Sequence, residues 1–556
     1  MIVFDQVRFS YEGATSPALK DINLRIAPGQ LVLVIGPTGS GKSTLLKAVN
    51  GLVPHFTGGR LDGRVTVGGL DTRTSPPRRL APLVGYVGQD PAAGFVADRV
   101  EDELVYGMEQ LGCSPAVMRA RLEETLDLLG LAALRRRDPA TLSAGQAQRV
   151  AMGAALAAHP QVLVLDEPTS ALDPAAAEDT MAAISRLVHD MDLTVLMAEH
   201  RLERVIQFAD QIVRLEPGGA ATIGPPRDQL ATSPVAPPVV RLGRRLGLTP
   251  VPLTVREARR AIREQGFALA TNTSAVPDAA PPAPAQADTA SGLSQAVLRG
   301  LPTAGPGGSA PAAEGGGSAG GEAAASATGP VVLAVEGINV THPGPVEAVK
   351  SVDLTLRAGE VVGLMGRNGA GKTSLLWALT RDQRGKPRPG LVLVPSEPTD
   401  LFWADSVAKE LGGPQADQWL DRLAPGIDRA AHPRDLSEGQ RLALALAIQL
   451  SANTQVIALD EPTRGLDYEA KDRLRRALVE LAGGGAALLI ASHDVEFLAG
   501  TVERIIWLSE GEVVTEGPAG ELLLRVPAHA PQVSKILAPV PALTIPEALA
   551  ALGADQ

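Results

Sequence analysis

The sequence contains a single cysteine, Cys113, and aromatic residues make up only 3% of its 556 positions. One cysteine excludes a disulfide within the chain and suits a reducing compartment. Apolar runs such as Leu31 to Ile35 have the length of a strand, well short of the roughly 18 residues of a membrane-spanning helix. Residues 1–5 contain neither a basic segment nor a long apolar one, which argues against a signal peptide. We therefore expect a cytoplasmic protein whose membrane role would depend on docking onto other subunits.

Basic residues are also fewer than acidic ones. The chain has 51 Lys and Arg against 62 Asp and Glu, a net charge of -11. Binding to a nucleic-acid backbone demands a cationic surface, so we expect no nucleic-acid partner. The length exceeds what one hydrophobic core supports and predicts two or three domains, for which 45% hydrophobic residues are sufficient.

Most of the chain is a duplication. Residues 29–44 (GQLVLVIGPTGSGKST) recur 330 positions later as residues 359–374 (GEVVGLMGRNGAGKTS). Three more pairs follow in the same order: LSAGQ and LSEGQ at 142–146 and 436–440, VLVLDEPTSALD and VIALDEPTRGLD at 162–173 and 456–467, and AEHRLE and ASHDVE at 198–203 and 491–496. This collinearity indicates that a whole domain is repeated, giving a first and a second half.

The composition and a second, shorter repeated segment suggest the domain boundaries. Between about 270 and 329 Ala, Pro, Gly and Ser dominate, which predicts a flexible linker. Related tails follow each copy at 236–258 and 530–548, where Thr254 and Thr544 are expected helix N-caps of the capping-box type. We predict five segments: a first repeated domain at 1–229, its appendage at 230–266, the linker at 267–330, a second repeated domain at 331–526 and its appendage at 527–556.

Each copy has a glycine-rich loop between a predicted buried strand and a predicted helix, which in the first half begins near Thr44. Glycines let backbone N–H groups point at phosphate oxygens, the lysine reaches the β- and γ-phosphates, and a Ser or Thr hydroxyl ligates Mg²⁺. The pattern predicts ATP and Mg²⁺ as cofactors. The residues expected to bind them are Gly36, Gly39, Gly41, Lys42, Ser43 and Thr44 in the first half, and Gly366, Gly369, Gly371, Lys372, Thr373 and Ser374 in the second.

An Asp-Glu pair ends a further apolar strand in each half. A carboxylate at the C-terminal end of a strand beside the loop can hold the Mg²⁺ shell, and we predict this role for Asp166 and Asp460. The adjacent Glu167 and Glu461 suit a general base that orients and deprotonates the attacking water.

The LSAGQ and LSEGQ segments carry a resemblance to a known family. In both halves the serine precedes the aspartate of LxLDEPTxxLD by 23 residues, and the chain resembles ATP-binding-cassette (ABC) ATPases over both halves. The resemblance implies an α/β fold with two tandem P-loop NTPase domains, each with a RecA-like core and a helical signature subdomain, joined by a disordered linker. It also implies ATP hydrolysis at two sites formed by head-to-tail pairing of the halves within one chain.

In this arrangement, site one would combine the first loop with Ser437 and Gly439, and site two the second loop with Ser143 and Gly145. The resemblance assigns further roles to single residues. These are Gln89 as the Q-loop glutamine that senses Mg²⁺ and the attacking water, His200 and His493 as switch histidines, Asp173 and Asp467 as D-loop aspartates, and Tyr11 as the adenine-stacking aromatic, with His342 at its equivalent position.

The two halves are unequal. The second half has Ser396 where the first has Gln89, and it separates Lys372 from Ser396 by 24 positions against 47 between Lys42 and Gln89. We therefore expect a β-subdomain, or part of one, to be missing from the second half. We also expect site two to couple hydrolysis to partner movement less well.

Three segments favour one branch of the family: residues 90–112, residues 198–205 and the repeated tail resemble the ATPases of energy-coupling-factor (ECF) importers. Fused A–A′ ATPases of that group lie on the inner face of the membrane with a membrane T subunit and a substrate-binding S subunit, and typically serve uptake of B vitamins, their precursors or transition-metal ions. The resemblance implies that the surface around 89–100 receives the T subunit, with Phe95 and Val96 either as contacts or as core residues.

The alternative is a soluble tandem ABC ATPase of the ABC-F translation-factor type. That family has a long, charged, helical linker, whereas this linker is rich in Pro and Gly and contains one basic residue, Arg299. A pseudo-ATPase would lack the base or the switch residues, and both are present twice.

Overall fold

The computed structural model describes residues 1–14, 16–170, 172–267, 329–342, 346–382, 385–452 and 454–554. Both repeats belong to one compact unit, residues 1–270 and 329–556. The predicted linker at 267–330 lies almost entirely outside the described residues, and the segment boundaries proposed from the sequence remain predictions. Within the described residues, no helix is both long and apolar enough to cross a bilayer.

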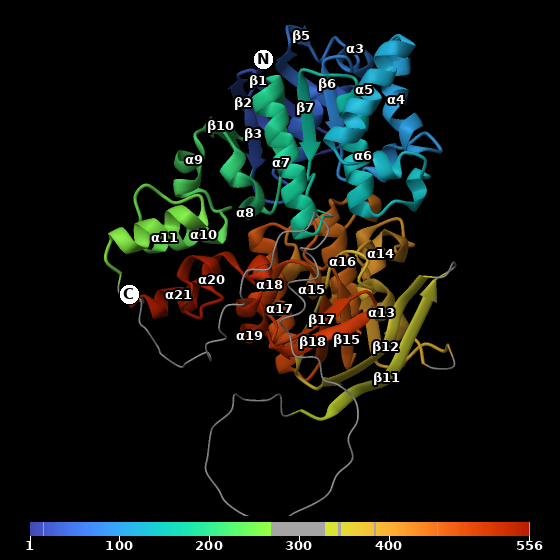
Figure 1. Cartoon of the computed structure of the whole chain (residues 1–556), viewed down its shortest axis with the longest axis vertical. Helices are drawn as coiled ribbons and strands as arrows, with labels where there is room; N and C mark the ends of the chain where they lie inside the picture. The colour runs from blue at the N-terminus through green and yellow to red at the C-terminus, as the bar shows by residue number, and fades with distance from the viewer. Residues whose placement is uncertain are drawn as a thin grey trace, which may run out of the picture. The chain divides into compact units, whose positions relative to one another are not determined.

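Each half is built on a six-stranded sheet whose central strands are fully buried (Figure 1). In the first half the order is β10-β9-β3-β8-β7-β6, parallel except for β10. Its strands are β3 (Leu31–Ile35), β6 (Val84–Val87), β7 (Val162–Asp166), β8 (Thr194–Ala198), β9 (Gln211–Leu215) and β10 (Ala221–Gly224).

The second half repeats this sheet in the order β14-β15-β16-β13-β17-β18, again with only the last strand antiparallel. Its strands are β13 (Val361–Met365), β14 (Leu391–Val394), β15 (Val456–Asp460), β16 (Ala487–Ala491), β17 (Arg504–Ser509) and β18 (Glu512–Pro518). The continuous apolar runs at β3, β7 and β15 form buried parallel strands, as the sequence predicts.

The halves differ in their antiparallel layer. The first has the sheet β2-β1-β4-β5, and the second, in its described part, has only the pair β11-β12. The strands are β1 (Ile2–Ser10), β2 (Leu19–Ile26), β4 (Arg60–Val67), β5 (Leu70–Asp71), β11 (Val331–His342) and β12 (Val346–Arg357). The shorter distance from Lys372 to Ser396 removes the segment that forms β4 and β5 in the first half, so part of the β-subdomain is missing as predicted.

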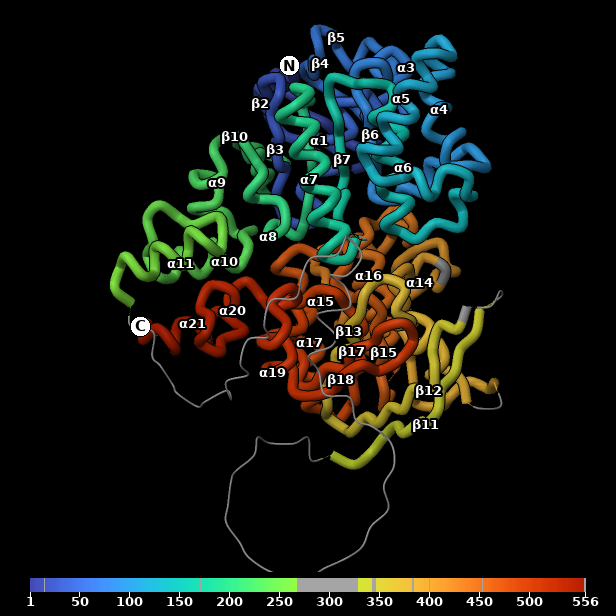
Figure 2. Tube along the Cα trace, in the orientation of Figure 1, coloured from blue at the N-terminus to red at the C-terminus, as the bar shows by residue number. Residues whose placement is uncertain are grey.

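Helices cover the sheets and form the signature subdomains (Figure 2). In the first half they are α1 (Lys42–Val49), α2 (Leu52–His55), α3 (Pro77–Leu80), α4 (Val100–Gln110), α5 (Pro115–Leu128), α6 (Ala144–Ala157), α7 (Pro174–Met191), α8 (Leu202–Val205) and α9 (Pro226–Thr232). In the second half they are α13 (Lys372–Leu379), α14 (Val407–Leu411), α15 (Pro414–Leu423), α16 (Glu438–Leu450), α17 (Tyr468–Gly483), α18 (Val495–Ala499) and α19 (Ala519–Arg525).

The repeated tails form two helical hairpins that pack together, α10 (Pro238–Arg245) and α11 (Val255–Glu264) against α20 (Gln532–Leu537) and α21 (Ile545–Ala551) (Figure 1). Thr254 caps α11 and Thr544 caps α21, as predicted. In both hairpins the carboxylate of the partner glutamate accepts the N–H of the residue before the cap instead of the cap's own N–H. This difference from a standard capping box lets the glutamate also fix the chain entering the helix.

Candidate active sites

The loop lysine is the first residue of the helix that follows each glycine-rich loop. Lys42 heads α1, two residues earlier than the predicted start, and its Nζ donates to the carbonyls of Gly36 at 2.9 Å and Pro37 at 3.1 Å. Lys372 Nζ makes the equivalent bond to Gly366 at 2.7 Å. Burial lowers the pKa of both ammonium groups, and the nearby carboxylates act against that shift. Each loop therefore surrounds a buried cation.

The loop requires glycine where it turns into the helix. Gly41 has φ 95° and Gly371 has φ 100°, a left-handed conformation that other residues rarely adopt. A Cβ at Gly41 would lie 2.4 Å from the Ala18 carbonyl oxygen. The hydroxyls of Thr38 and Ser40 are buried and have no hydrogen-bond partner among the described residues. An open cradle with unsatisfied hydroxyls and a buried cation fits the phosphates of ATP.

The predicted Mg²⁺ ligands lie together in each half. Thr373 Oγ1 donates to Asp460 Oδ2 at 2.8 Å, and the Ser43 hydroxyl is near enough to Asp166 to lower its pKa. Burial raises the pKa of Asp166 and of Asp460 to about 6, with the adjacent glutamate adding to the shift. A carboxylate and a hydroxyl oxygen at the loop are the hard donors that Mg²⁺ prefers, so these residues fit the ion.

The candidate bases have strained backbones in both halves. Glu167 has φ 55° and Glu461 has φ 48°, left-handed values that are uncommon outside glycine and that cluster at functional sites. Glu167 Oε1 accepts a hydrogen bond from Gln89 Nε2 at 2.7 Å and lies 3.1 Å from His200 Nε2. The structure thus brings together three residues predicted from distant motifs.

In site two the glutamate has different partners. Glu461 Oε1 lies 2.7 Å from His493 Nδ1, and Glu461 Oε2 accepts a bond from Ser492 Oγ at 3.1 Å. The histidine therefore faces the base through Nδ1 here and through Nε2 in site one. Within the described part of the chain Ser396 makes no hydrogen bond to Glu461, whose side-chain partners are Ser492 and His493.

Both bases are ionised at neutral pH. Burial acts to raise the pKa of Glu461, but His493 outweighs it and lowers the pKa to about 2. Burial also acts to raise the pKa of Glu167, but His200 and Lys42 outweigh it, and the pKa stays below its usual value. Burial lowers the pKa of His493. An ionised carboxylate that faces the loop lysine can accept a proton from water.

The halves are paired head to tail. The N–H of Thr38 in the first loop donates to Asp467 Oδ2 of the second half at 2.6 Å, and Gly439 of the second signature lines the same pocket as Thr38. Asp173 of the first half acts electrostatically on Lys372 of the second. Each glycine-rich loop therefore faces the D-loop of the opposite half, in the arrangement implied by the resemblance.

The signature residues form the first turn of a helix and do not merely precede it. Ser143 and Ser437 are the N-caps of α6 and α16, each in a complete capping box with the glutamine of LSxGQ. A Cβ at Gly439 would lie 2.8 Å from the Gly465 carbonyl oxygen, so this helix approaches the D-loop as closely as glycine permits. The helix N-terminus offers N–H groups and a favourable dipole to an anion.

Tyr11 and His342 occupy matching places beside the two loop helices. The Tyr11 hydroxyl lies 2.9 Å from Thr44 Oγ1, and His342 Nε2 lies 2.9 Å from Ser374 Oγ. Tyr11 is exposed and packs edge-on against Phe9. Its stacking on adenine stays a prediction.

Sequence reasoning missed three residues at the contact between the halves: Arg201, Tyr468 and Asp494. The Tyr468 hydroxyl accepts from the Leu202 N–H at 3.2 Å and donates to Glu203, and Arg201 lies opposite Asp494. The available signal was a difference between the repeats, since AEHRLE has Arg201 where ASHDVE has Asp494.

A carboxyl of the same region has a raised pKa. Burial, together with the nearby Glu203, raises the pKa of Glu496 from 4.5 to about 8, while its Oε1 accepts the Gln532 N–H at 2.6 Å. The folded state therefore binds more protons than the unfolded state between these values and loses stability as the pH rises through that window. Glu496→Gln keeps the hydrogen-bond acceptor and removes the charge, so the variant should gain melting temperature relative to the wild type as the pH rises. We expect this gain to be roughly 2 to 4 °C larger at about pH 8.5 than at about pH 6.

Scanning calorimetry or fluorimetry at the two pH values measures this difference. The exposed Glu178→Gln is the matched control and should change little at either pH. An equal shift of the Glu496 variant at both pH values would contradict the prediction.

Comparison with known proteins places these features in one family. The model of the ABC transporter family matches residues 19–170 and 349–464. A protein of Streptomyces coelicolor described as an ABC transporter ATP-binding protein is 50% identical over 99% of this chain and 100% of its own length. A protein of Methanosarcina mazei with the same description is 29% identical over 94% of this chain and 90% of its own length.

Solved structures of single cassettes match part of the chain. The cbiO1 protein of Clostridium perfringens, described as part of the ABC transporter complex cbiONQ, is 27% identical, with a TM-score of 0.38, over 42% of this chain and 90% of its own. The cassette MJ0796, in a dimer bound to ADP and phosphate, is 27% identical, with a TM-score of 0.37, over 41% of this chain and 99% of its own.

Proposed function

Because the chain belongs to the ABC transporter family of ATP-binding proteins, we propose that it is the ATP-hydrolysing subunit of an ECF-type importer. In this role it pairs its two halves around ATP and drives a membrane T subunit and a substrate-binding S subunit from the cytoplasmic face of the membrane. The cargo is a B vitamin, a vitamin precursor or a transition-metal ion. The segments at 90–112 and 198–205 and the repeated tail support this assignment.

Hydrolysis at site one follows from the geometry of the chain's own residues. Bound Mg²⁺ would be held by Ser43 and Asp166 and would neutralise charge on the phosphates. Gln89 and His200 fix the orientation of the Glu167 carboxylate, which accepts the proton of the attacking water. The helix N-terminus at Ser437 of the other half would offer its N–H groups to the γ-phosphate. Closure of the halves thus completes the site, and ATP favours the closed state by binding it more tightly.

The observation that carries the membrane partner is an exposed apolar residue at the same place in each half. Val96 is 61% exposed and its counterpart Trp403 is 85% exposed. The residues just before them, Phe95 and Phe402, pack against the cores. Of the two predicted contacts, Phe95 is thus partly a core residue, and Val96 is available to a partner.

In each half a buried glutamate accepts backbone hydrogen bonds from the loop that contains the exposed residue. Glu103 Oε2 accepts the N–H groups of Val96 at 2.8 Å and Ala97 at 2.9 Å, and Glu410 accepts the N–H of Ala404 in the second half. Both glutamates are buried. Such buried hydrogen bonds fix the two apolar side chains in an exposed position, which suits contact with an apolar element of another subunit.

Purification of the tagged chain from native membranes tests the proposal. We expect a polytopic membrane protein to co-purify with the wild type, and the double variant Val96→Asp/Trp403→Asp to lose at least about tenfold of it, because charge at the centre of an apolar contact removes several kcal/mol of binding. ATP turnover of the isolated chain should stay within about twofold, since neither residue touches the nucleotide sites.

The exposed Val479→Asp on α17 is the matched control and should retain the membrane protein. Mass spectrometry identifies the retained proteins and any bound small molecule. A wild-type chain that recovers only soluble partners, such as ribosomal proteins, would reject the transport assignment.

A further inference from the structure

The residue that follows the switch histidine has opposite charges in the two halves. Alignment of 198–203 with 491–496 places Arg201 and Asp494 at the same position. Arg201 Nη2 lies 3.8 Å from Asp494 Oδ2, and the two residues are 4% and 3% exposed. Equivalent residues of two paired domains contact each other only beside the axis that relates the domains. This pair therefore lies at the pseudo-twofold axis of the chain.

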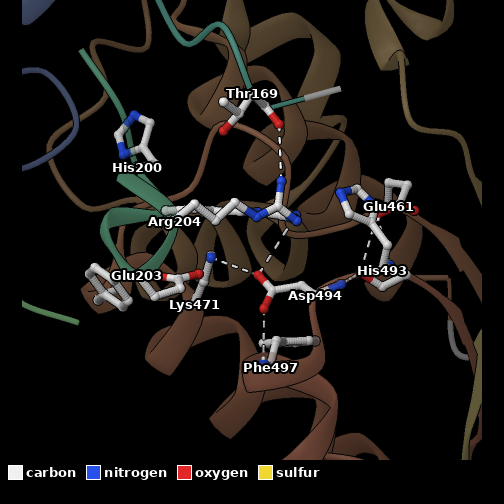
Figure 3. A network of polar contacts seen from close by, with 12 residues as sticks. Thr169, His200, Glu203, Arg204, Glu461, Lys471, His493, Asp494 and Phe497 are labelled. Atoms are coloured by element: carbon white, nitrogen blue, oxygen red, sulfur yellow. Dashed lines mark hydrogen bonds and ion pairs between the residues drawn. The ribbon is translucent and has the colours of Figure 1, made fainter. Parts of the chain in front are cut away.

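Asp494 is firmly held within the second half. Lys471 Nζ donates to its Oδ2 at 2.6 Å, and its Oδ1 accepts the Phe497 N–H at 3.1 Å (Figure 3). Burial acts to raise the pKa of Asp494, but Lys471 and Arg201 outweigh burial and hold it well below its usual range. The carboxylate is thus ionised and fixed in position.

Arg201, in contrast, is stabilised mainly by carboxylates of the other half, with smaller contributions from Glu203 and Glu199 of its own half. Neither terminal nitrogen of its guanidinium has a hydrogen-bond partner in the described part of the chain. Burial acts to lower the pKa of Arg201, and carboxylates, with Asp494 foremost, raise it overall, so the group stays charged. A buried cation is unfavourable without an opposite charge nearby, and the ion-pair partner of Arg201 belongs to the second half.

Neighbouring positions also differ between the repeats in a complementary way. Tyr468 at the start of α17 donates to Glu203 of the first half, whereas its counterpart Pro174 has no hydroxyl. Lys471, which supports Asp494, has Ala177 as its counterpart. The polar groups around the axis therefore match only when a first half meets a second half.

We propose that Arg201 and Asp494 select the pairing of unlike halves. Two first halves would bring Arg201 against Arg201 at a buried axis, and two second halves would bring Asp494 against Asp494. Like charges in such a position oppose association, whereas the pairing within one chain joins opposite charges. The inference rests on the pairing of halves in the proposed function and is independent of the transported solute.

A double-mutant cycle in the full-length chain tests the charge pairing. We expect Arg201→Asp and Asp494→Arg each to lower ATP turnover at least about tenfold. The effect of Asp494→Arg should be larger, because the new arginine would lie beside the cations of Arg201 and Lys471. The double variant Arg201→Asp/Asp494→Arg restores one positive and one negative charge across the axis and should recover to within about threefold of the wild type. The exposed pair Arg260–Glu264 provides the control: Arg260→Asp should leave turnover unchanged.

Mixing the two single variants tests whether these charges decide which halves pair. One variant has a negative charge at this position in both halves and the other has a positive charge in both, so halves from different chains match and halves of the same chain repel. We expect light scattering with MgATP to detect a species with the mass of two chains in the mixture, and only single chains for the wild type and for each variant alone.

Recovery in the double variant together with the two-chain species supports the proposal. A double variant no better than the product of the single effects, or a mixture that stays at the mass of single chains, overturns it. If a charge reversal prevents folding, the cycle is measured with Arg201→Gln and Asp494→Asn, where a coupling below about twofold overturns the proposal in the same way. None of these measurements needs a membrane subunit, so they can fail or succeed separately from the transport assignment.

Discussion

Replacing Glu167 with glutamine should lower ATP turnover at least about 100-fold, whereas the same change at Glu461 should lower it by less than about threefold. An amide cannot accept the proton of the attacking water. Glu167 is oriented by both Gln89 and His200, while Glu461 has its histidine and Ser492 but no glutamine. Most turnover is therefore expected to come from site one.

Steady-state phosphate release measures this difference, and binding of a fluorescent ATP analogue provides the control. Both variants should bind the analogue as the wild type does, because glutamine preserves the size of the side chain and removes only its basicity. Equal losses of turnover in the two variants would show that the sites are equivalent and would remove the predicted asymmetry.

Loss of both loop lysines should abolish turnover and weaken ATP binding at each site roughly 10- to 100-fold. Each ammonium is buried under its loop and bonded to loop carbonyls, where it can donate to phosphate oxygens. Charge-assisted hydrogen bonds of this kind contribute about 1.5 to 3 kcal/mol, or roughly 10- to 100-fold in affinity. We expect this result for the double variant Lys42→Ala/Lys372→Ala in calorimetric titration with ATP.

The exposed Lys20→Ala is the control for a change of surface charge and should bind ATP normally. Each single lysine variant should retain one class of binding site in the titration. Undiminished turnover of the double variant would contradict ATP hydrolysis at these loops.

The two halves also differ in how far their sites could be predicted. In the first half, Gln89, Glu167 and His200 belong to motifs far apart in the sequence, yet the structure brings their side chains within hydrogen-bond distance. In the second half, the motif showed that the glutamine was missing at Ser396. It could not show that Ser492 contacts the base, because a serine before a histidine has no distinctive pattern.

The sequence by itself determined the duplication, the glycine-rich loops and the buried strands that precede them. These features depend on local chemistry: continuous apolar residues favour a strand covered on both faces, and Gly41 fits a left-handed turn that other residues avoid. The capping roles of Thr254 and Thr544 could also be predicted from local sequence, because a cap accepts an N–H group only three residues away.

Only the tertiary structure decided which residues meet across the halves. Asp467 contacts Thr38 over a separation of 429 positions, and only the packing showed that Phe95 lies against the core while Val96 is exposed. Such contacts depend on how two surfaces fit, and a single sequence contains no local period or spacing that records that fit. Arg201 and Asp494 illustrate the boundary: each looked like an ordinary charged residue beside a motif, and their significance appeared only when the fold placed one against the other.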